Sequence, residues 1–241
     1  MRAIRRLLGT ATLVAVLLAI AFALYAFAKS RPQDLPWTPL DLAEPPGMFT
    51  AGKLADLGDD FPACRALLDK AGIAYQALAS VTAGQCGYDD AVRLPAEGAR
   101  RIGFAPRGVG MACPVAAALA MWEWNVLQPA AERHFGSRVR TIEHFGSYSC
   151  RRMYGRSAGD WSEHARANAL DVAGFVLANG TRVSVVRDWS GAGAKPAFLR
   201  EVRDGACHLF ATVLSPDYNA AHRDHFHLDQ ANRAAGWRAC R

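Results

Sequence analysis

The most hydrophobic stretch of the chain is near its beginning, because residues 7–28 contain no charged side chain. About 20 apolar residues cross a bilayer as a helix, and the arginines that precede the run predict a cytoplasmic N-terminus. Ala26-Phe27-Ala28 also has the small-x-small form of a signal-peptidase site. The length of the run favours a transmembrane signal anchor over residues 1–28, with a cleaved leader as the alternative. We expect a single-pass protein of the inner (cytoplasmic) membrane, with its C-terminal domain in the periplasm or cell exterior.

A proline-rich stretch follows this apolar run. Five of the twelve prolines lie within residues 29–48, a density that excludes a continuous helix and is typical of a semi-rigid linker. We therefore expect a spacer over 29–48 and a folded domain over 49–241, which is long enough for one sizeable core.

Helical periodicity recurs in three places within this domain. Residues 60–72 place apolar side chains at spacings of three and four, and a glycine ends the run. The strongest signal is residues 113–135, where Pro114 suits the first helical position and Pro129 suggests a break. A shorter helix is expected over 196–203.

Strand patterns are interspersed with these helices. Residues 139–145 alternate in polarity, and residues 172–177 and 181–186 flank an Asn-Gly pair, which predicts a hairpin. The other expected strands are short ones within 74–94, with turns at Gly84 and Gly87, and a last strand over 224–228. This mixture indicates the α+β class.

The positive net charge of the chain comes mainly from its N-terminal segment. The chain carries +6 at pH 7, but five positive charges and no acid lie in its first 31 residues, which leaves +1 for the remainder. Basic residues that flank an apolar run are a topology signal. The charge therefore gives no support for nucleic-acid binding.

Six cysteines lie beyond the apolar run. In an exported chain an even number predicts up to three disulfides, whose pairing spacing alone does not resolve. Cys64 with Cys86 is the first expectation, because both flank one small region of predicted strands. The sequence has no Cys-x-x-Cys pair, which argues against a thiolate zinc knuckle or a thioredoxin-like site.

Two stretches, residues 162–171 and 222–229, gather histidines and acidic residues. Imidazole nitrogen together with carboxylate oxygen is a ligand set that suits zinc. We predict a mononuclear Zn²⁺ site formed by His164, Asp171 and His227.

The order of these residues resembles that of the zinc D,D-carboxypeptidases and D-Ala-D-Ala dipeptidases of bacterial cell walls, in the form Ser-x-His-x-x-Ala-x-Ala-x-Asp followed by His-x-His. The resemblance implies the same three ligands and a small antiparallel sheet packed with helices. A closer similarity, over roughly residues 62–229, is to the bacterial extensin-like C-terminal domain family. It rests on Ala-Cys-Pro, Gly-Ser-Tyr-Ser-Cys-Arg, Ser-Glu-His-Ala and His-x-Asp-His-Phe-His.

Two positions depart from the peptidase pattern. Ala167 replaces a glycine between the first two ligands, which would shift the loop if a positive φ is required there. Asp224 replaces the catalytic glutamate three residues before the last ligand. Because alternate side chains of a strand share a face, His225 would point with His227 towards the metal and Asp224 away. We expect His225 as the general base, with Asp224 as the alternative if a bulge turns it inward.

Two further residues complete the expected site. Arg151 matches an arginine that contacts substrate or developing negative charge in the peptidases, and its guanidinium can hold a carboxylate through two hydrogen bonds. The alternative is a surface arginine beside a disulfide. Ser162 is expected to hydrogen-bond the loop, the ligand shell or the substrate.

These features predict an exported, membrane-tethered zinc metallohydrolase, similar to carboxypeptidases or endopeptidases, that cleaves peptide bonds in peptidoglycan stem peptides. The alternative is a non-catalytic, metal-stabilised module of the cell envelope, in which His225 is a fourth ligand. The expected partners are a cell-wall peptide or peptidoglycan and, through the N-terminal helix, the inner membrane. No nucleic acid is expected.

Overall fold

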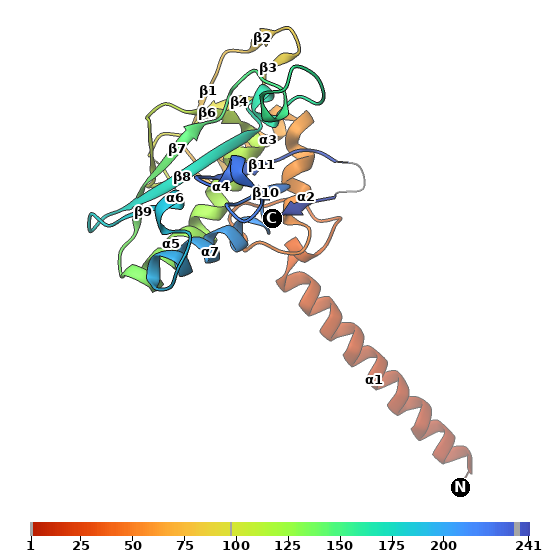
Figure 1. Cartoon of the computed structure of the whole chain (residues 1–241). Coiled ribbons are helices and arrows are strands. Elements are labelled where there is room, and N and C mark those ends of the chain that lie inside the picture. The colour runs from red at the N-terminus through yellow and green to blue at the C-terminus, as the bar shows by residue number, and fades with distance from the viewer. Residues whose placement is uncertain (1, 97, 234–236) are drawn as a thin grey trace.

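A long apolar helix precedes the folded part of the chain (Figure 1). The computed structural model describes residues 2–96, 98–233 and 237–241. Helix α1 (Arg2–Ser30) reaches a mean hydropathy of 2.5 over 18 residues, and none of that window is buried against the protein. The expected N-terminal apolar helix is therefore confirmed. Its length and composition fit either a membrane anchor or a signal sequence.

The proline-rich stretch after α1 is folded and partly packed into the core. A 3-10 turn, η1 (Pro32–Asp34), follows α1 directly. Leu40 and Leu42 are buried in the main hydrophobic core, and the Asp41 carboxylate pairs with Lys70 Nζ at 2.9 Å. Part of the stretch that we expected to act as a spacer therefore belongs structurally to the domain.

Short helices come next, and the capping of α3 follows directly from its sequence. The elements are α2 (Thr50–Ala55), η2 (Asp56–Asp59) and α3 (Phe61–Lys70). The Asp60 carboxylate accepts a hydrogen bond of 2.9 Å from the Ala63 N–H, as a helix N-cap does. Gly72 follows α3 with φ of +67°, a conformation that glycine adopts without strain. The predicted helix over 60–72 is confirmed.

Two small sheets lie beyond α3. Strands β1 (Gln76–Ala77), β4 (Ala91–Arg93) and β6 (Gly110–Ala112) form one antiparallel sheet, and β2 (Val81–Ala83) with β3 (Cys86–Tyr88) forms a hairpin. Gly84 lies in the turn of this hairpin, as expected, whereas Gly87 lies within β3. An added Cβ at Gly87 would lie 2.0 Å from the Val81 carbonyl oxygen, so close strand pairing explains this glycine.

The strongest predicted helix forms the centre of the core. It comprises α4 (Cys113–Trp122), a π-helical turn η3 (Glu123–Leu127) and α5 (Gln128–Phe135). All ten residues of α4 are buried. Pro129 lies in the first turn of α5, so the expected irregularity appears as the π turn before it. Trp122 is completely buried and its indole N–H donates to the Val202 carbonyl oxygen at 2.9 Å.

The main sheet has seven strands within the described residues, in the order β12-β10-β11-β8-β7-β5 with β9 paired to β8. They are β5 (Gly103–Ala105), β7 (Val139–Gly146), β8 (Ala169–Leu177), β9 (Arg182–Ser184), β10 (Thr212–Leu214), β11 (Phe226–Asp229) and β12 (Ala239–Cys240). β8 and β9 form the predicted hairpin. β5 is parallel to β7 and β12 is parallel to β10, while the other pairs are antiparallel.

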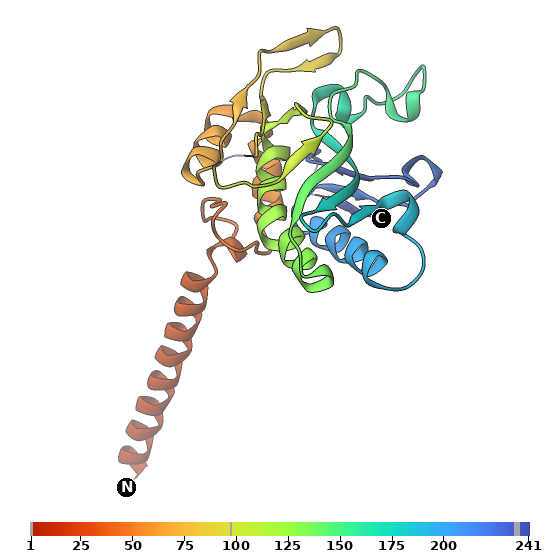
Figure 2. The same cartoon turned by 90° about the vertical axis from the view of Figure 1, so that its left-hand side faces the viewer.

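The expected small antiparallel sheet is therefore correct at the centre and wrong at the edges. Two parallel strands need a crossover connection, and α4 and α5 supply it between β5 and β7. Helix α7 (Ala194–Ala206), longer than the predicted 196–203, packs with α4 and α5 against the sheet (Figures 1 and 2). Phe175 of β8 contacts Trp122 and Phe198, with ring centroids 6.0 and 5.4 Å apart.

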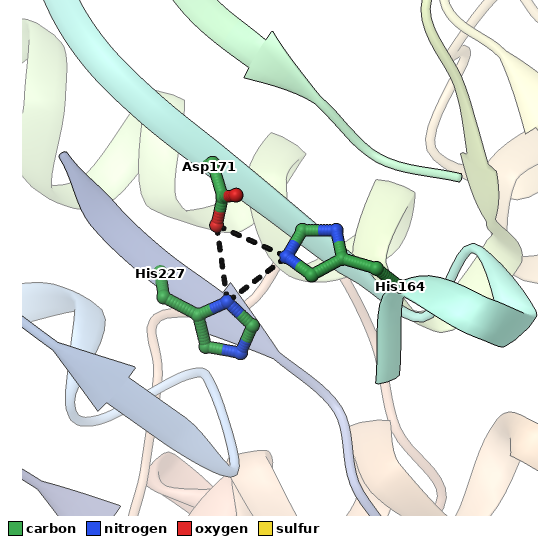
Figure 3. Close-up of side chains that lie close together, drawn as sticks. All are labelled: His164, Asp171 and His227. Carbon is green, nitrogen blue, oxygen red and sulfur yellow. Dashed lines mark hydrogen bonds and ion pairs between the residues drawn. The ribbon is translucent and has the colours of Figure 1, made fainter. Parts of the chain in front are cut away.

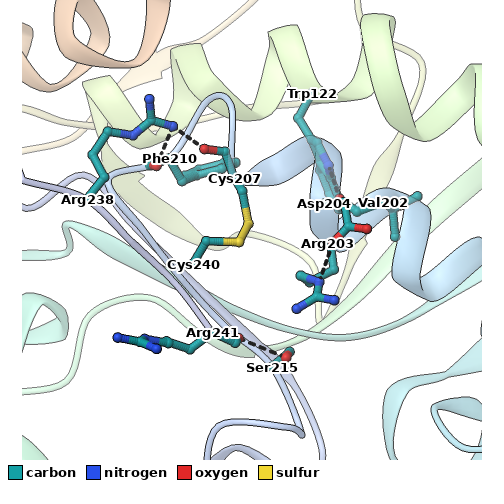
Figure 4. The surroundings of a disulfide bond; sticks show 10 residues. All are labelled: Trp122, Val202, Arg203, Asp204, Cys207, Phe210, Ser215, Arg238, Cys240 and Arg241. Carbon is teal, nitrogen blue, oxygen red and sulfur yellow. Dashed lines mark hydrogen bonds and ion pairs between the residues drawn. A yellow bond between two sulfur atoms is a disulfide. The ribbon is translucent and has the colours of Figure 1, made fainter.

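Three disulfides join parts of the chain that are distant in sequence: Cys64–Cys113, Cys86–Cys150 and Cys207–Cys240. The expected Cys64–Cys86 pair was wrong. Cys64 lies on α3, which packs against the N-terminal end of α4, whereas the β2–β3 hairpin brings Cys86 to the loop after β7. The third bridge fastens the end of α7 to β12 (Figure 4). Three disulfides fit an exported, oxidising compartment.

Candidate metal centre

Three predicted ligands come together where β8, β11 and a short 3-10 turn meet (Figure 3). His164 lies in the turn η5 (Glu163–Arg166), Asp171 in β8 and His227 in β11. β8 and β11 are neighbours, and their register places His227 directly opposite Asp171. All three side chains are buried. The predicted set of three donors is thus assembled by sheet register and one turn.

The three donor atoms form a nearly equilateral triangle. His164 Nε2 lies 3.1 Å from Asp171 Oδ1 and 3.1 Å from His227 Nδ1, and His227 Nδ1 lies 3.0 Å from Asp171 Oδ1. Ligands about 2.1 Å from a tetrahedral zinc ion lie about 3.4 Å from one another. The observed triangle is slightly tighter, so the residues fit a zinc ion with small outward movements.

The outer nitrogen of each histidine has its own acceptor. His164 Nδ1 donates to the Ser147 carbonyl oxygen at 2.5 Å, and His227 Nε2 donates to Asp229 Oδ2 at 3.0 Å. A hydrogen on the outer nitrogen leaves the lone pair of the inner nitrogen directed into the triangle. Such acceptors are typical partners of metal-binding histidines, because they set the tautomer and the ring orientation.

The loop that holds His164 requires an unusual backbone. The Ser162 hydroxyl accepts from the His164 N–H at 3.3 Å and caps η5. Ala167 ends the turn with φ of +56°, so the left-handed conformation considered from the sequence is found at this position. The Ala167 carbonyl oxygen accepts hydrogen bonds from Ser147 Oγ at 3.0 Å and from the Ala112 N–H at 2.9 Å. Tertiary contacts therefore hold the alanine in this conformation.

Neighbouring side chains in the cluster strongly shift the pKa values of Asp171 and His227. Burial raises the pKa of Asp171, but the hydrogen bonds and charges of His164 and His227 outweigh it and leave that pKa well below its usual range. Burial lowers the pKa of His227, but the carboxylates of Asp171 and Asp229 outweigh it and raise that pKa to about 9. Without a cation the cluster therefore retains a proton between its carboxylates and imidazoles, and a bound metal has to displace it.

His225 lies beside this cluster, at the place where the predicted strand was too long. β11 begins at Phe226, so Asp224 and His225 precede it and strand alternation does not apply to them. His225 Nε2 lies 3.5 Å from Asp171 Oδ1, and His225 Nδ1 lies 2.8 Å from Asp224 Oδ1. His225 therefore points towards the cluster, as predicted, and Asp224 contacts the ring nitrogen on the opposite side, Nδ1.

Arg151 lies at the edge of the centre. One guanidinium nitrogen is 4.0 Å from Asp171 Oδ2, and another donates to Ser149 Oγ at 3.0 Å. The side chain is 46% exposed and follows the Cys86–Cys150 disulfide. Arg151 is thus a half-exposed arginine beside a disulfide that also lies next to the cluster, and its contact with substrate stays a prediction.

These residues line an open cleft of about 240 Å³. Its walls also contain an aromatic and a basic side chain to which the sequence assigned no role, Tyr154 and Arg233. Tyr154 has φ of +57° and its ring lies 6.4 Å from that of His222. A hydrophobicity pattern cannot identify these residues, because they reach the cleft from a loop and from the segment after β11.

Comparison with known proteins gives one match. The model of the family described as "Extensin-like protein C-terminus" matches residues 62–241. No curated protein and no solved structure matches the chain.

Proposed function

Since the chain belongs to the extensin-like protein C-terminal family, whose description names no reaction, we propose its function from the site itself. We propose a membrane-tethered, exported zinc metallohydrolase that cleaves peptide bonds in peptidoglycan stem peptides. Its zinc ligands are His164, Asp171 and His227. Further support comes from the resemblance of its two histidine-containing motifs to those of the zinc D,D-carboxypeptidases.

The observation that carries this proposal is the triangle of donors with an acceptor behind each histidine. Two imidazoles and one carboxylate at one side of an open cleft leave room for a fourth ligand from solvent or substrate. Three protein ligands with one open position are typical of catalytic zinc sites, whereas structural sites are closed by four. When bound, Zn²⁺ polarises a carbonyl group and makes water acidic enough to act as a nucleophile near neutral pH.

His225 is the residue that we propose to move protons. Its Nε2 faces the cluster, 3.5 Å from Asp171 Oδ1. Its Nδ1 donates a hydrogen bond of 2.8 Å to Asp224 Oδ1. This arrangement leaves Nε2 able to accept a proton, and the Asp224 carboxylate would stabilise the resulting imidazolium. A positioned base of this kind typically contributes about 10²- to 10⁴-fold to the rate.

Arg151 and Ser162 are the proposed contacts to substrate. The half-exposed Arg151 guanidinium lies on the cleft wall, where it can pair with a carboxylate or with negative charge that develops on the reacting carbonyl. Ser162 also lines the cleft, but its hydroxyl already accepts from the His164 N–H. Its first role is therefore to hold the ligand loop, and contact with substrate would use its remaining hydrogen-bonding capacity.

Two independent features support export and a membrane location. The three disulfides fit an oxidising compartment, and α1 is long and apolar enough to span a bilayer. We propose that α1 remains attached as a single-pass anchor in the inner membrane. The catalytic domain then lies in the periplasm, where peptidoglycan is accessible.

Metal content of the full chain tests the proposal. We expect about one zinc per chain by elemental mass spectrometry, lost in His164→Ala but retained in His134→Ala, whose imidazole contacts Glu201 instead. Hydrolysis of a stem pentapeptide and of its cross-linked dimer should be lost in His164→Ala, Asp171→Ala and His227→Ala. A metal-free triple variant that remains fully active would refute the proposal.

One distance favours the non-catalytic alternative and gives a second test. The 3.5 Å between His225 Nε2 and Asp171 Oδ1 is close to the spacing of about 3.4 Å between two ligands of one tetrahedral zinc. If His225 is a proton carrier, His225→Ala keeps its zinc and loses activity by about 10²- to 10⁴-fold. If it is a fourth ligand of a closed site, the same variant binds zinc much more weakly, and the unsubstituted protein is inactive.

A further inference from the structure

Large apolar side chains are exposed immediately after α1. We call residues 31–49 the juxtamembrane segment. Within it, Trp37 is 77% exposed and Met48 is 76% exposed, and Phe49 is exposed to 36%. Exposed apolar side chains that cluster in one segment often mark a surface that is covered by a partner.

The segment is folded so that the backbone that carries these side chains lies beside the end of α1. The Met48 N–H donates to Asp34 Oδ1 at 2.7 Å, and the Phe49 N–H donates to the Gln33 carbonyl oxygen at 3.2 Å. The Thr38 hydroxyl contacts the Pro32 carbonyl oxygen. Residues 47–49 and the turn with Trp37 are therefore both fastened to η1, although they lie up to 17 positions after Pro32 in sequence.

The position of η1 relative to α1 limits where these side chains can be. The helix ends at Ser30, its hydrogen bonding continues from the Arg31 N–H to the Phe27 carbonyl oxygen at 3.1 Å, and η1 begins at Pro32. The charge-free run of α1 ends at Ala28 and is followed by Lys29. Lipid headgroups add only about 5–8 Å to each side of the hydrocarbon layer. If α1 spans the bilayer, η1 and the residues bonded to it lie at headgroup depth.

We propose that the Trp37–Met48 surface of the juxtamembrane segment docks onto the bilayer into which α1 inserts. Tryptophan prefers this interfacial layer, because its ring is apolar and its N–H is polar. The membrane is the partner because α1 is continuous with the segment and ends one residue before it. This inference rests on α1 as a retained anchor and is independent of the metal centre.

Docking would also orient the cleft. The segment is fixed to the domain by the buried side chains of Leu40 and Leu42 and by the Asp41–Lys70 ion pair. In both views the part of the chain around residues 151–160, which borders the cleft, lies on the side of the domain remote from α1 (Figures 1 and 2). The domain would therefore sit directly on the membrane, with the stretch around residues 151–160, which borders the cleft, on the side away from it.

Tryptophan fluorescence of the full chain in vesicles tests the docking, because α1 contains no tryptophan. The probe is a vesicle of phosphatidylethanolamine and phosphatidylglycerol whose acyl chains carry bromine close to the headgroup. We expect bromine to quench the fluorescence, Trp37→Phe to remove most of this quenching, and Trp161→Phe in the cleft to preserve it. Quenching that is unchanged by Trp37→Phe would overturn the proposal.

A second measurement separates docking from anchoring. The chain should resist extraction from the vesicles by alkaline carbonate, both with and without the Trp37→Phe substitution. A photoreactive phenylalanine analogue at position 48 should form lipid adducts, whereas the same analogue at position 218, where the exposed Tyr218 lies near the cleft residue His222, should form few. Equal labelling at both positions, or extraction by carbonate, would overturn the docking. Neither result would affect the zinc measurement.

Discussion

Asp171 and His227 face each other across β8 and β11, with Asp171 Oδ1 3.0 Å from His227 Nδ1. They are separated by 56 positions in sequence, so only strand pairing brings them together. A shift of one residue in a strand register turns every side chain to the opposite face. The candidate metal centre therefore depends on the pairing of these two strands as much as on the identity of its ligands.

The hydrogen bond behind His227 gives the first prediction. Asp229→Asn keeps the size of the side chain but removes the charge that faces His227 Nε2 at 3.0 Å. We expect zinc affinity to fall by about 10- to 100-fold, as is usual when such partners are altered. Competition with a chromophoric chelator measures the change. Asp204→Asn, at a position 64% exposed, is the matched control and should leave the affinity unchanged.

The left-handed Ala167 gives the second prediction. Alanine at positive φ costs about 1–2 kcal/mol relative to glycine, while loss of a buried methyl group costs about 0.8 kcal/mol. Ala167→Gly should therefore leave the free energy of unfolding within about 1 kcal/mol of its original value. Ala167→Val places a branched side chain at φ of +56° in a fully buried site, and should destabilise the protein and lower its zinc content. Urea unfolding and metal analysis measure both effects, and equal behaviour of the two variants would contradict this account.

The disulfides are expected to differ in their effect on the site. The Cys207–Cys240 bridge closes a separation of 33 residues, so its replacement by two serines should lower the free energy of unfolding by about 3–4 kcal/mol. Zinc affinity should remain, because this bridge joins α7 to β12. Replacement of Cys86 and Cys150 should lower zinc affinity as well, because Cys150 precedes Arg151 and follows the segment whose Ser147 carbonyl holds His164. Affinities measured on folded variants distinguish the two bridges.

Asp90 predicts a pH dependence of stability that is unrelated to the metal. Burial raises the pKa of its carboxyl from 3.8 to about 6. The folded state therefore binds more protons than the unfolded state between these values, and Asp90 makes the protein lose stability as pH rises through this range. Asp90→Asn should remove that loss and be more stable than the unsubstituted protein at pH 7, but not at pH 4. Urea midpoints between pH 4 and 7 measure the slope, and the exposed Asp56→Asn should not alter it.

Local elements were well predicted because their causes lie within a few residues. The Asp60 cap of α3, the buried run of α4 and the Asn179-Gly180 turn between β8 and β9 all follow from short-range sequence. Errors arose where distant segments meet, as in the Cys64–Cys113 and Cys86–Cys150 disulfides, and at the ends of elements. The last strand was extended back to Asp224, whereas the side chain of Asp224 instead contacts His225 and the strand begins at Phe226.

Sequence alone determined an apolar N-terminal helix, a mixed α and β composition and three residues of suitable metal-binding chemistry, because these depend on residue type and short spacing. Tertiary structure decided which cysteines pair, that the Ser147 carbonyl orients His164, and that Leu40 and Leu42 join the core. Each of these contacts joins segments that lie far apart along the chain. Packing and strand register bring such segments together, and neither can be predicted from a local sequence pattern.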